Sequence, residues 1–244
     1  MIRQFARRAA QFRAIWLVIG LLVGTLIVVA VASIANIPHL GRATFGDNNS
    51  AATSRPISAV PPLAGDGLAP GTYSIVRGSL KATITIPGGW GNLDQRGVTS
   101  NDSSAVVVFW PFPADFNEVY ADPCHWKTTA IEPAVGPTVD DLANALAAQA
   151  MRGEAVPTAV SIDGHSGKVL EMSVPSDLDF ADCDDGFFYS WAGRFHQGPG
   201  QIDRVYILDV DGTRQVFIAH HMPRDSEADL AEQQAIVDSI QIFP

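Results

Sequence analysis

The chain has 244 residues, of which 47% are hydrophobic and 17% are charged, and its formal net charge is −10 at pH 7. Binding to nucleic acid or to anionic lipid requires Lys and Arg side chains that neutralise phosphate groups, so an acidic chain is poorly suited to either. The composition therefore argues against a nucleic-acid partner. The length allows one domain of ordinary size once an N-terminal segment and a linker are set aside.

An uncharged apolar stretch covers residues 14–37. A helix needs about 20 apolar residues to cross the hydrocarbon core of a bilayer, so this stretch predicts a transmembrane anchor. Residues 1–13 contain basic but no acidic side chains, which predicts a cytoplasmic N-terminal tail and an extracytoplasmic C-terminal domain in the cell membrane. The alternative is a cleaved signal peptide with small residues at Ser33-Ile34-Ala35, although the apolar region of a signal peptide usually spans only about 7–15 residues.

Residues 38–70 are rich in Pro, Gly, Ala, Ser and Asn and show no sustained apolar period. Such a composition buries too little surface to fold, so we expect a flexible linker followed by an ordered domain over residues 71–244. Four of the 16 basic residues precede the anchor and all 26 acidic residues follow it, so the part beyond the anchor has a formal charge of 12 − 26 = −14. This charge favours solubility of the domain.

Apolar alternation and turn residues predict the first elements of the domain. Strands are expected over residues 72–76 and 81–86, because KATITI alternates and Pro87-Gly88-Gly89 stops it. A third strand is expected over residues 105–110. An amphipathic helix is expected over residues 139–151, with Thr138 as its N-cap and acidic residues in its first turn.

Two hairpins are predicted in the second half of the domain. Asp211-Gly212 is a strong two-residue turn signal, and it fixes a register in which Val210 faces Thr213 and Tyr206 faces Phe217. Asp209 then faces Arg214, and Ile207 faces Val216. Both faces of residues 205–210 are apolar, which is typical of a central strand. A weaker turn at Asp163-Gly164 joins expected strands over residues 159–162 and 168–174.

The chain ends with an expected helix that begins at Ser226 in a capping-box-like Ser-Glu-Ala-Asp sequence and runs to about Ser239. A short strand over residues 240–243 follows. Strands outnumber helices and are joined by tight turns, so the predicted class is α+β, a mainly antiparallel β-sheet flanked by helices after one N-terminal transmembrane helix.

Cys124 and Cys183 are the two cysteines of the chain. An even pair in an oxidising compartment predicts a disulfide, which would close a loop of about 60 residues and stabilise the fold by about 4 kcal/mol. The alternative is a catalytic Cys124 with His125 as its base. Neighbouring side chains usually point apart, and the sequence offers no separate orienting group, so we expect no catalytic residue here.

An acidic run near Cys183 is the candidate cation site, because hard ions prefer several flexible carboxylates. The candidate ligands are Asp177, Asp179, Asp182, Asp184 and Asp185. Their spacing does not match an EF-hand loop, and the alternative is a solvated loop whose aspartates cap turns. His220-His221 does not predict zinc, because consecutive side chains of a strand point to opposite faces.

A group of aromatic and polar residues precedes the Gly198-Pro199-Gly200 loop and is the candidate ligand cleft, since amphipathic rings beside a loop often contact ligands. The candidate cleft residues are Tyr189, Trp191, Phe195, His196 and Gln197. The alternative is that these rings belong to the core, where each aromatic side chain buries a large area.

Three segments, TITIPGGW, VYILDVDGTRQVFIA and EQQAIVDSIQI, occur in an order that resembles the PsbP-like superfamily, including the LpqN-type exported proteins of actinobacteria. The segments VYADPCHW and CDDGFFYSWAGRFHQGPGQ are similar to a group of actinobacterial membrane-anchored proteins, which implies that Cys124 and Cys183 form a shared bridge. The resemblance covers about the C-terminal 170 residues and implies an antiparallel sheet with flanking helices, used for binding or assembly. The chain lacks the lipobox cysteine of LpqN-type proteins, so their mode of anchoring is not implied.

The sequence therefore predicts a membrane-anchored, extracytoplasmic, non-catalytic binding or sensing domain with no cofactor. Its partner is expected to be an envelope protein or a small-molecule ligand. Two alternatives remain open: a hydrolase that acts on envelope material through dispersed catalytic residues, and a structural component of an envelope complex.

Overall fold

The computed structural model describes residues 57–65, 67–153 and 155–243. The predicted tail and anchor, residues 1–37, lie outside the described residues, as does the first part of the predicted linker. Within the described ranges no helix is long and apolar enough to cross a membrane.

A large antiparallel sheet forms the centre of the described domain, with the strand order β3-β4-β5-β11-β10-β7-β6. Its central strands are continuous apolar runs such as VVVFW in β5, which suits a strand that is covered on both faces. The strands are β3 (Trp90–Leu93), β4 (Gly97–Ser100), β5 (Val106–Trp110), β6 (Thr158–Ile162), β7 (His165–Ser173), β10 (Ile202–Val210) and β11 (Thr213–His221).

The predicted register of the β10–β11 hairpin is confirmed. Val210 pairs with Thr213 and Tyr206 pairs with Phe217. The turn residues Asp211 and Gly212 have φ angles of 51° and 80°, a left-handed conformation that Gly adopts freely and that Asp tolerates. Strand β10 lies between β11 and β7, as its two apolar faces predicted. The β6–β7 hairpin at Asp163-Gly164 is also present.

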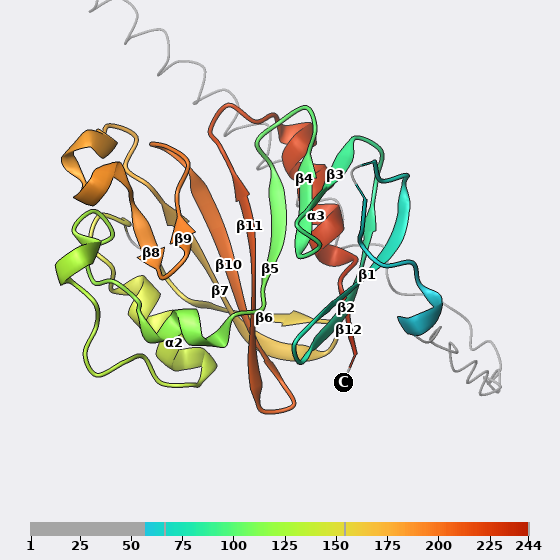
Figure 1. Cartoon of the computed structure of the whole chain (residues 1–244), viewed down its shortest axis with the longest axis horizontal. Coiled ribbons are helices and arrows are strands. Elements are labelled where there is room, and N and C mark those ends of the chain that lie inside the picture. Colours follow the sequence, from blue (N-terminus) through green and yellow to red (C-terminus); the bar gives the residue numbers. More distant parts are fainter. Residues whose placement is uncertain (1–56, 66, 154, 244) are drawn as a thin grey trace, which may run out of the picture. The chain divides into compact units, whose positions relative to one another are not determined.

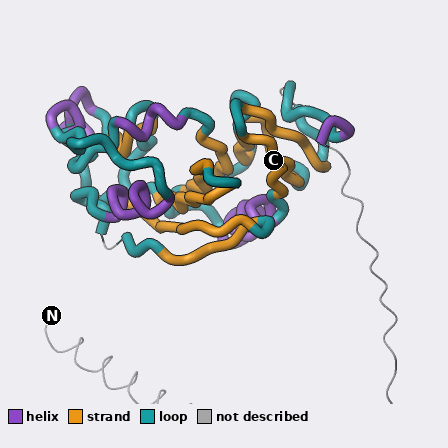
Figure 2. Tube along the Cα trace, turned by 90° about the horizontal axis from the view of Figure 1, so that it is seen from below, coloured by secondary structure: helices purple, strands orange, loops and turns teal. Residues whose placement is uncertain are grey.

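A second, smaller sheet has the order β1-β2-β12, with β1 (Gly71–Arg77), β2 (Leu80–Ile86) and β12 (Gln241–Phe243). In Figure 2 the C-terminal end of the chain lies among the strands of this sheet. The predicted linker ends too late, because residues before Gly71 already pack against the domain. Pro62 forms a parallel bridge to Ser74, and Leu63 is buried in the core.

The two α-helices of the described residues begin at the predicted N-caps, and each start is a capping box, which the sequence predicted only for Ser226. Thr138 caps α2 (Val139–Ala147) and Ser226 caps α3 (Glu227–Asp238). Helix α2 ends earlier than residue 151, because the amide of Ala150 donates to the carbonyl of Ala121 instead of continuing the helix. Short 3-10 helices are η1 (Ile57–Ala59), η2 (Pro113–Asn117), η3 (Trp126–Thr128), η4 (Phe180–Asp182) and η5 (Asp184–Gly186).

The large sheet has a different cover on each face (Figure 1). Alternate residues of a strand point to opposite faces, so Phe109 of β5 packs with the small sheet and α3, whereas Trp110 packs on the side of α2. The α2 side also carries a two-stranded hairpin of β8 (Tyr189–Trp191) and β9 (Arg194–Phe195). The described domain is therefore α+β, with one apolar core on each side of the large antiparallel sheet.

The sequence did not predict β3, β4, β8 or β9. Each of these strands has four residues or fewer, which is too short for a period of two to stand out from a loop. Their places in the fold come from pairing with neighbours, for example β4 with β5.

Leu63→Ala tests whether the segment before Gly71 belongs to the domain. Leu63 is 2% exposed, and truncating a buried leucine costs about 2–5 kcal/mol through lost burial and the cavity that remains. We expect a loss of that size in urea unfolding of the full chain. Val156→Ala, at a side chain that is 64% exposed, is the control and should change stability by less than about 0.5 kcal/mol. Equal effects of the two substitutions would restore the linker assignment.

Candidate functional site

The disulfide between Cys124 and Cys183 is present, as predicted. It joins the loop before η3 to the loop between η4 and η5, two segments separated by 59 positions in sequence. Cys124 is therefore not available as a nucleophile. Phe188 packs in the same small buried cluster as the bridge, so the disulfide is covered by apolar side chains.

The candidate cation ligands lie in the turns around this disulfide. Asp179 accepts a hydrogen bond from the amide of Ala181 at 2.9 Å, and Asp184 accepts one from the amide of Lys127 at 3.0 Å. The described residues contain no group of three or more His, Cys, Asp or Glu side chains placed to hold a metal ion. Asp179 thus has the turn-capping role, because its carboxylate satisfies an amide of its own turn. Asp184 instead bonds an amide of η3, which lies far away in sequence.

The five candidate cleft residues do not line one common cavity. Trp191 and His196 are buried, Tyr189 is half-buried, and Phe195 and Gln197 are exposed. Strand alternation separates Phe195 from His196, whereas Trp191 lies in the apolar core on the α2 side, where the register shifts between Tyr189 and Trp191. The predicted cleft is therefore corrected to two features: a surface of rings on one side of the hairpin and a buried polar network on the other.

The surface feature consists of four aromatic side chains, Trp126, Phe187, Tyr189 and Phe195, which we call the aromatic surface. The ring of Tyr189 lies 4.9 Å from that of Trp126, 5.8 Å from that of Phe187 and 6.1 Å from that of Phe195, centroid to centroid. Phe187 and Phe195 are 44% and 47% exposed. Contacting rings that remain open to solvent are typical of a surface that binds a partner.

Hydrogen bonds to neighbouring loops hold the aromatic surface in place. The indole nitrogen of Trp126 donates to the carbonyl of Asp184 at 3.0 Å, and the amide of Tyr189 donates to the carbonyl of Pro123 at 2.9 Å. Both contacts lie beside the disulfide, which joins the two loops covalently. The rings are therefore held on a base that is fixed by the disulfide and by these hydrogen bonds.

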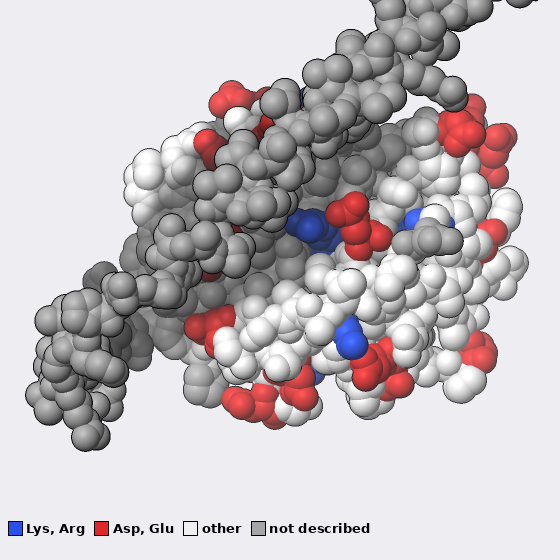
Figure 3. Space-filling model, turned by 180° about the vertical axis from the view of Figure 1, so that it is seen from behind, with Lys and Arg blue, Asp and Glu red and all other residues white. Residues whose placement is uncertain are grey.

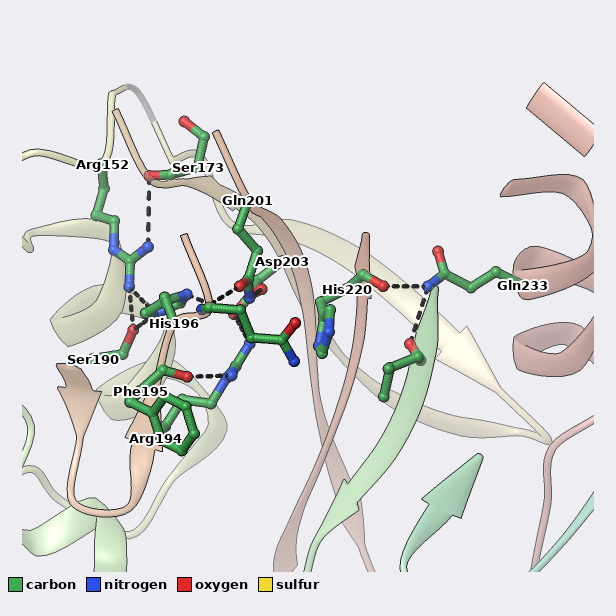
Figure 4. A network of polar contacts seen from close by, with 12 residues as sticks. Arg152, Ser173, Ser190, Arg194, Phe195, His196, Gln201, Asp203, His220 and Gln233 are labelled. Atoms are coloured by element: carbon green, nitrogen blue, oxygen red, sulfur yellow. Dashed lines mark hydrogen bonds and ion pairs between the residues drawn. The ribbon is translucent and has the colours of Figure 1, made fainter. Parts of the chain in front are cut away.

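The buried network under the hairpin includes a serine, a histidine and an aspartate (Figure 4). Ser190 Oγ lies 2.8 Å from His196 Nε2, and His196 Nδ1 lies 3.6 Å from Asp203 Oδ2. The three side chains come from β8, from the residue after β9 and from β10. Each of them is at most 2% exposed.

Two arginines complete this network. Arg194 donates to Asp203 Oδ2 at 2.6 Å, and Gln201 donates to Asp203 Oδ1 at 2.7 Å. Arg152 donates to Ser190 Oγ and also lies 2.7 Å from His196 Nε2. Both oxygens of the carboxylate and the Nε2 atom of the imidazole therefore already have charged or polar partners inside the protein.

The pKa values of three groups in the network, Arg152, His196 and Asp203, are all lowered. Burial lowers the pKa of Arg152 to about 9, with Arg194 acting in the same direction. Burial also holds the pKa of His196 well below 6.5, helped by the charge of Arg152. Burial alone would raise the pKa of Asp203, but Arg194 and the nearby histidines outweigh it and hold that pKa well below its ordinary value. At neutral pH the network consists of two arginine cations, one carboxylate and a neutral imidazole.

The geometry of the Ser190–His196–Asp203 group is unsuited to acyl transfer. A general base needs a free imidazole nitrogen facing the nucleophile, whereas His196 Nε2 also faces the guanidinium of Arg152 at 2.7 Å. The aspartate that should orient the imidazole is 3.6 Å away and is instead bonded to Arg194. The serine is buried, so a substrate has no approach to it. The group instead joins the hairpin to β10.

His220 extends the buried polar region on β11. Its side chain is 5% exposed, and both of its ring nitrogens lack a hydrogen-bond partner within the described residues. Burial, followed by the charge of Arg194, lowers its pKa to about 4. His221 is only half-buried, so the two histidines occupy different environments on consecutive positions of a strand.

Open cavities of the described domain lie elsewhere. One of about 400 Å³ lies between the start of α2 and the ends of β7 and β10, with Lys168 and Arg214 in its lining. Another of about 490 Å³ lies between α3 and the sheet, with Glu171 and Arg204 in its lining. Both are open and have linings of mixed polarity, and the capping box of α2 already uses the amide of Asp141.

Sequence reasoning missed Arg152, Ser190, Arg194 and Asp203. A signal for two of them exists, because Arg194 interrupts the aromatic segment FFYSWAGRF and Asp203 precedes the apolar run of β10. A charge inside an apolar segment indicates a buried pair when both positions face the core. The partner of each charge depends on how β9 lies against β10, which the sequence pattern does not contain.

No family model matches the chain, and no curated protein matches it. Among solved structures it is similar to the solution structure of cyanobacterial PsbP (CyanoP) from Synechocystis sp. PCC 6803, with 14% sequence identity, coverage of 74% of this chain and 96% of that chain, and a TM-score of 0.37. That protein carries the name of the superfamily that the sequence segments resemble. A TM-score this low does not assign the chain to a family, and its relation to LpqN-type proteins stays a prediction.

The buried histidines predict a loss of stability in mild acid. The unfolded chain binds a proton at His220 below pH 6.5, whereas the folded chain does so only near pH 4, so the free energy of unfolding falls as pH decreases across that interval. The loss from His220 alone is about 3 kcal/mol. We expect urea unfolding of the full chain between pH 7.5 and 4.5 to show this slope, and His220→Phe to reduce it. An unchanged slope in that variant would exclude His220 as its source.

Proposed function

We propose that this chain is a membrane-anchored, extracytoplasmic, non-catalytic binding domain that contacts its ligand through the aromatic surface. The observation that carries the proposal is that Phe187 and Phe195 are each nearly half-exposed while their rings pack against Tyr189. The uncharged stretch over residues 14–37 supports the anchor, and the disulfide supports an oxidising compartment.

The position of the surface agrees with a binding role. Exposed phenylalanines cost free energy in water, because their apolar area is not removed from solvent. Four rings in one contacting group offer a partner a large apolar area at a low entropic cost, since each ring is already held by its neighbours. A surface that only had to be soluble would not gather these side chains on one hairpin and its neighbouring turn.

Site-specific photo-crosslinking tests the proposal. A photoreactive phenylalanine at position 195 of the full chain in its native membranes should give a discrete adduct, because that position lies on the aromatic surface. The same residue at Val76, which is 60% exposed on β1, is the control and should give none. Phe187→Ser should remove the adduct from position 195. Equal crosslinking from both positions would contradict a specific surface, and one dominant protein partner would favour assembly in an envelope complex.

A hydrolase is the second candidate, because Ser190 Oγ lies 2.8 Å from His196 Nε2. A fluorophosphonate probe that reacts with activated serines distinguishes the two functions. We expect no adduct on the full chain by intact-mass measurement, because Ser190 is 1% exposed and Arg152 also donates to it. An adduct that disappears in Ser190→Ala would support the hydrolase and overturn the non-catalytic proposal.

A further inference from the structure

The aromatic surface already holds a cation of its own chain. The ammonium group of Lys127 lies 5.7 Å from the centroid of the Trp126 ring and 2.5 Å from a carboxylate oxygen of Asp185. A ring face next to a carboxylate is the arrangement in which proteins hold cationic groups, because the negative face of the ring and the anion attract the same charge. The side chain of Lys127 is 46% exposed, so a competing cation can reach this position.

One acidic side chain, that of Asp185, contacts Lys127 on the aromatic surface, and others precede the rings in sequence. Only Gly186 separates Asp185 from Phe187 in sequence, and the preceding segment carries exposed carboxylates at Asp177, Asp179 and Asp182. Figure 3 shows that acidic groups are spread widely over the face of the domain seen from behind and that basic groups on it are few. The aromatic surface is therefore complementary to positive charge beside Asp185, as is the domain more generally.

The rings are tilted and do not form a flat platform. The plane of Tyr189 makes an angle of 55° with that of Phe187 and 61° with that of Phe195, and the latter two planes meet at 77°. Tilted rings present faces and edges in several directions, which suits separate guanidinium or ammonium groups along a chain. A single sugar ring would be better served by a coplanar face.

We propose that the partner of the aromatic surface is a basic segment of another protein, rich in Arg or Lys, and that Lys127 occupies the position that one of its cations takes. The inference rests on the proposed function and names its partner class. Each basic side chain contacts a ring face while the neighbouring carboxylates neutralise its charge. An anionic lipid surface is disfavoured by those carboxylates, and a neutral glycan makes no use of them.

Fluorescence anisotropy with a fluorescein-labelled hexa-arginine peptide tests the inference on the full chain in detergent micelles. We expect binding, and we expect Phe187→Ser/Phe195→Ser to weaken it about tenfold, because two exposed ring contacts with cations are lost. The two positions are solvent-exposed, and an unchanged Tm would show that the variant is folded. Glu227→Gln removes one negative charge at an exposed position of α3 and should leave binding within about twofold, since a distant surface charge is screened.

Lys127→Ala should strengthen the binding of hexa-arginine, whereas the double phenylalanine variant should weaken it. Removing the internal cation frees the Trp126 ring and Asp185, so we expect the affinity for hexa-arginine to rise by about threefold, the strength of one exposed cation–ring contact. Lys168→Ala removes the same charge beside Asp140, far from the rings in sequence, and controls for the change in net charge. Equal effects of the two lysine variants, or no effect of the double phenylalanine variant, would reduce the binding to general attraction and overturn the inference.

Two further probes separate the inference from the proposed function. Phosphatidylglycerol vesicles or chitohexaose that bind in a manner dependent on Phe187 and Phe195, in place of hexa-arginine, would overturn the basic partner and identify a lipid or a glycan. If hexa-arginine fails to bind while the photo-crosslink at position 195 persists, the inference fails and the binding function stands. If the crosslink is also absent, both fail.

Discussion

The ion pair between Asp203 and Arg194 is the interaction on which the position of the β8–β9 hairpin depends. A carboxylate at 1% exposure is stable only if it is paired and fully hydrogen-bonded, because burying an unpaired charge costs several kcal/mol. Arg194 and Gln201 supply those bonds at 2.6 Å and 2.7 Å. Since Arg194 belongs to β9 and Asp203 to β10, the pair joins the short hairpin to the large sheet. The hairpin has only five strand residues, too few to hold its position by backbone pairing alone.

The same hairpin separates two environments that the sequence presents as one aromatic segment. On its inner side Ser190 and His196 meet Arg152 in a network with little access to water. On its outer side Tyr189 and Phe195 lie beside Phe187 and form part of the aromatic surface. The disulfide from Cys124 to Cys183 holds the adjacent turn, so the exposed rings rest on a covalent link at one end and a buried ion pair at the other. Rigid support of this kind is what a binding surface requires, because it limits the entropy lost on binding.

The Ser190–His196–Asp203 group shows why residue types alone do not define an enzyme. The serine-to-histidine distance of 2.8 Å is suitable for proton transfer. However, the atoms of His196 and Asp203 that would act in catalysis already contact other side chains. Arg152 meets the imidazole where the base should act, and Arg194 holds the carboxylate that should orient it. The arrangement stabilises a fold, and its charges shift pKa values for structural reasons that resemble those of an active site.

The sequence by itself determined the features that depend on near neighbours. The capping residues Thr138 and Ser226, the turn at Asp211-Gly212 and the register of β10 with β11 all follow from interactions within a few residues. The disulfide is an exception, because its cysteines are 59 positions apart and it was predicted from an even cysteine pair. The uncharged stretch over residues 14–37 likewise predicts an anchor from its composition, although it lies outside the described residues. Only the tertiary structure decided that Leu63 is core, that β3 and β4 exist, and that Trp191 and His196 are buried while Phe195 is exposed. These depend on contacts between segments far apart in sequence, whose partners are set by packing and charge pairing in three dimensions and leave no period in the chain.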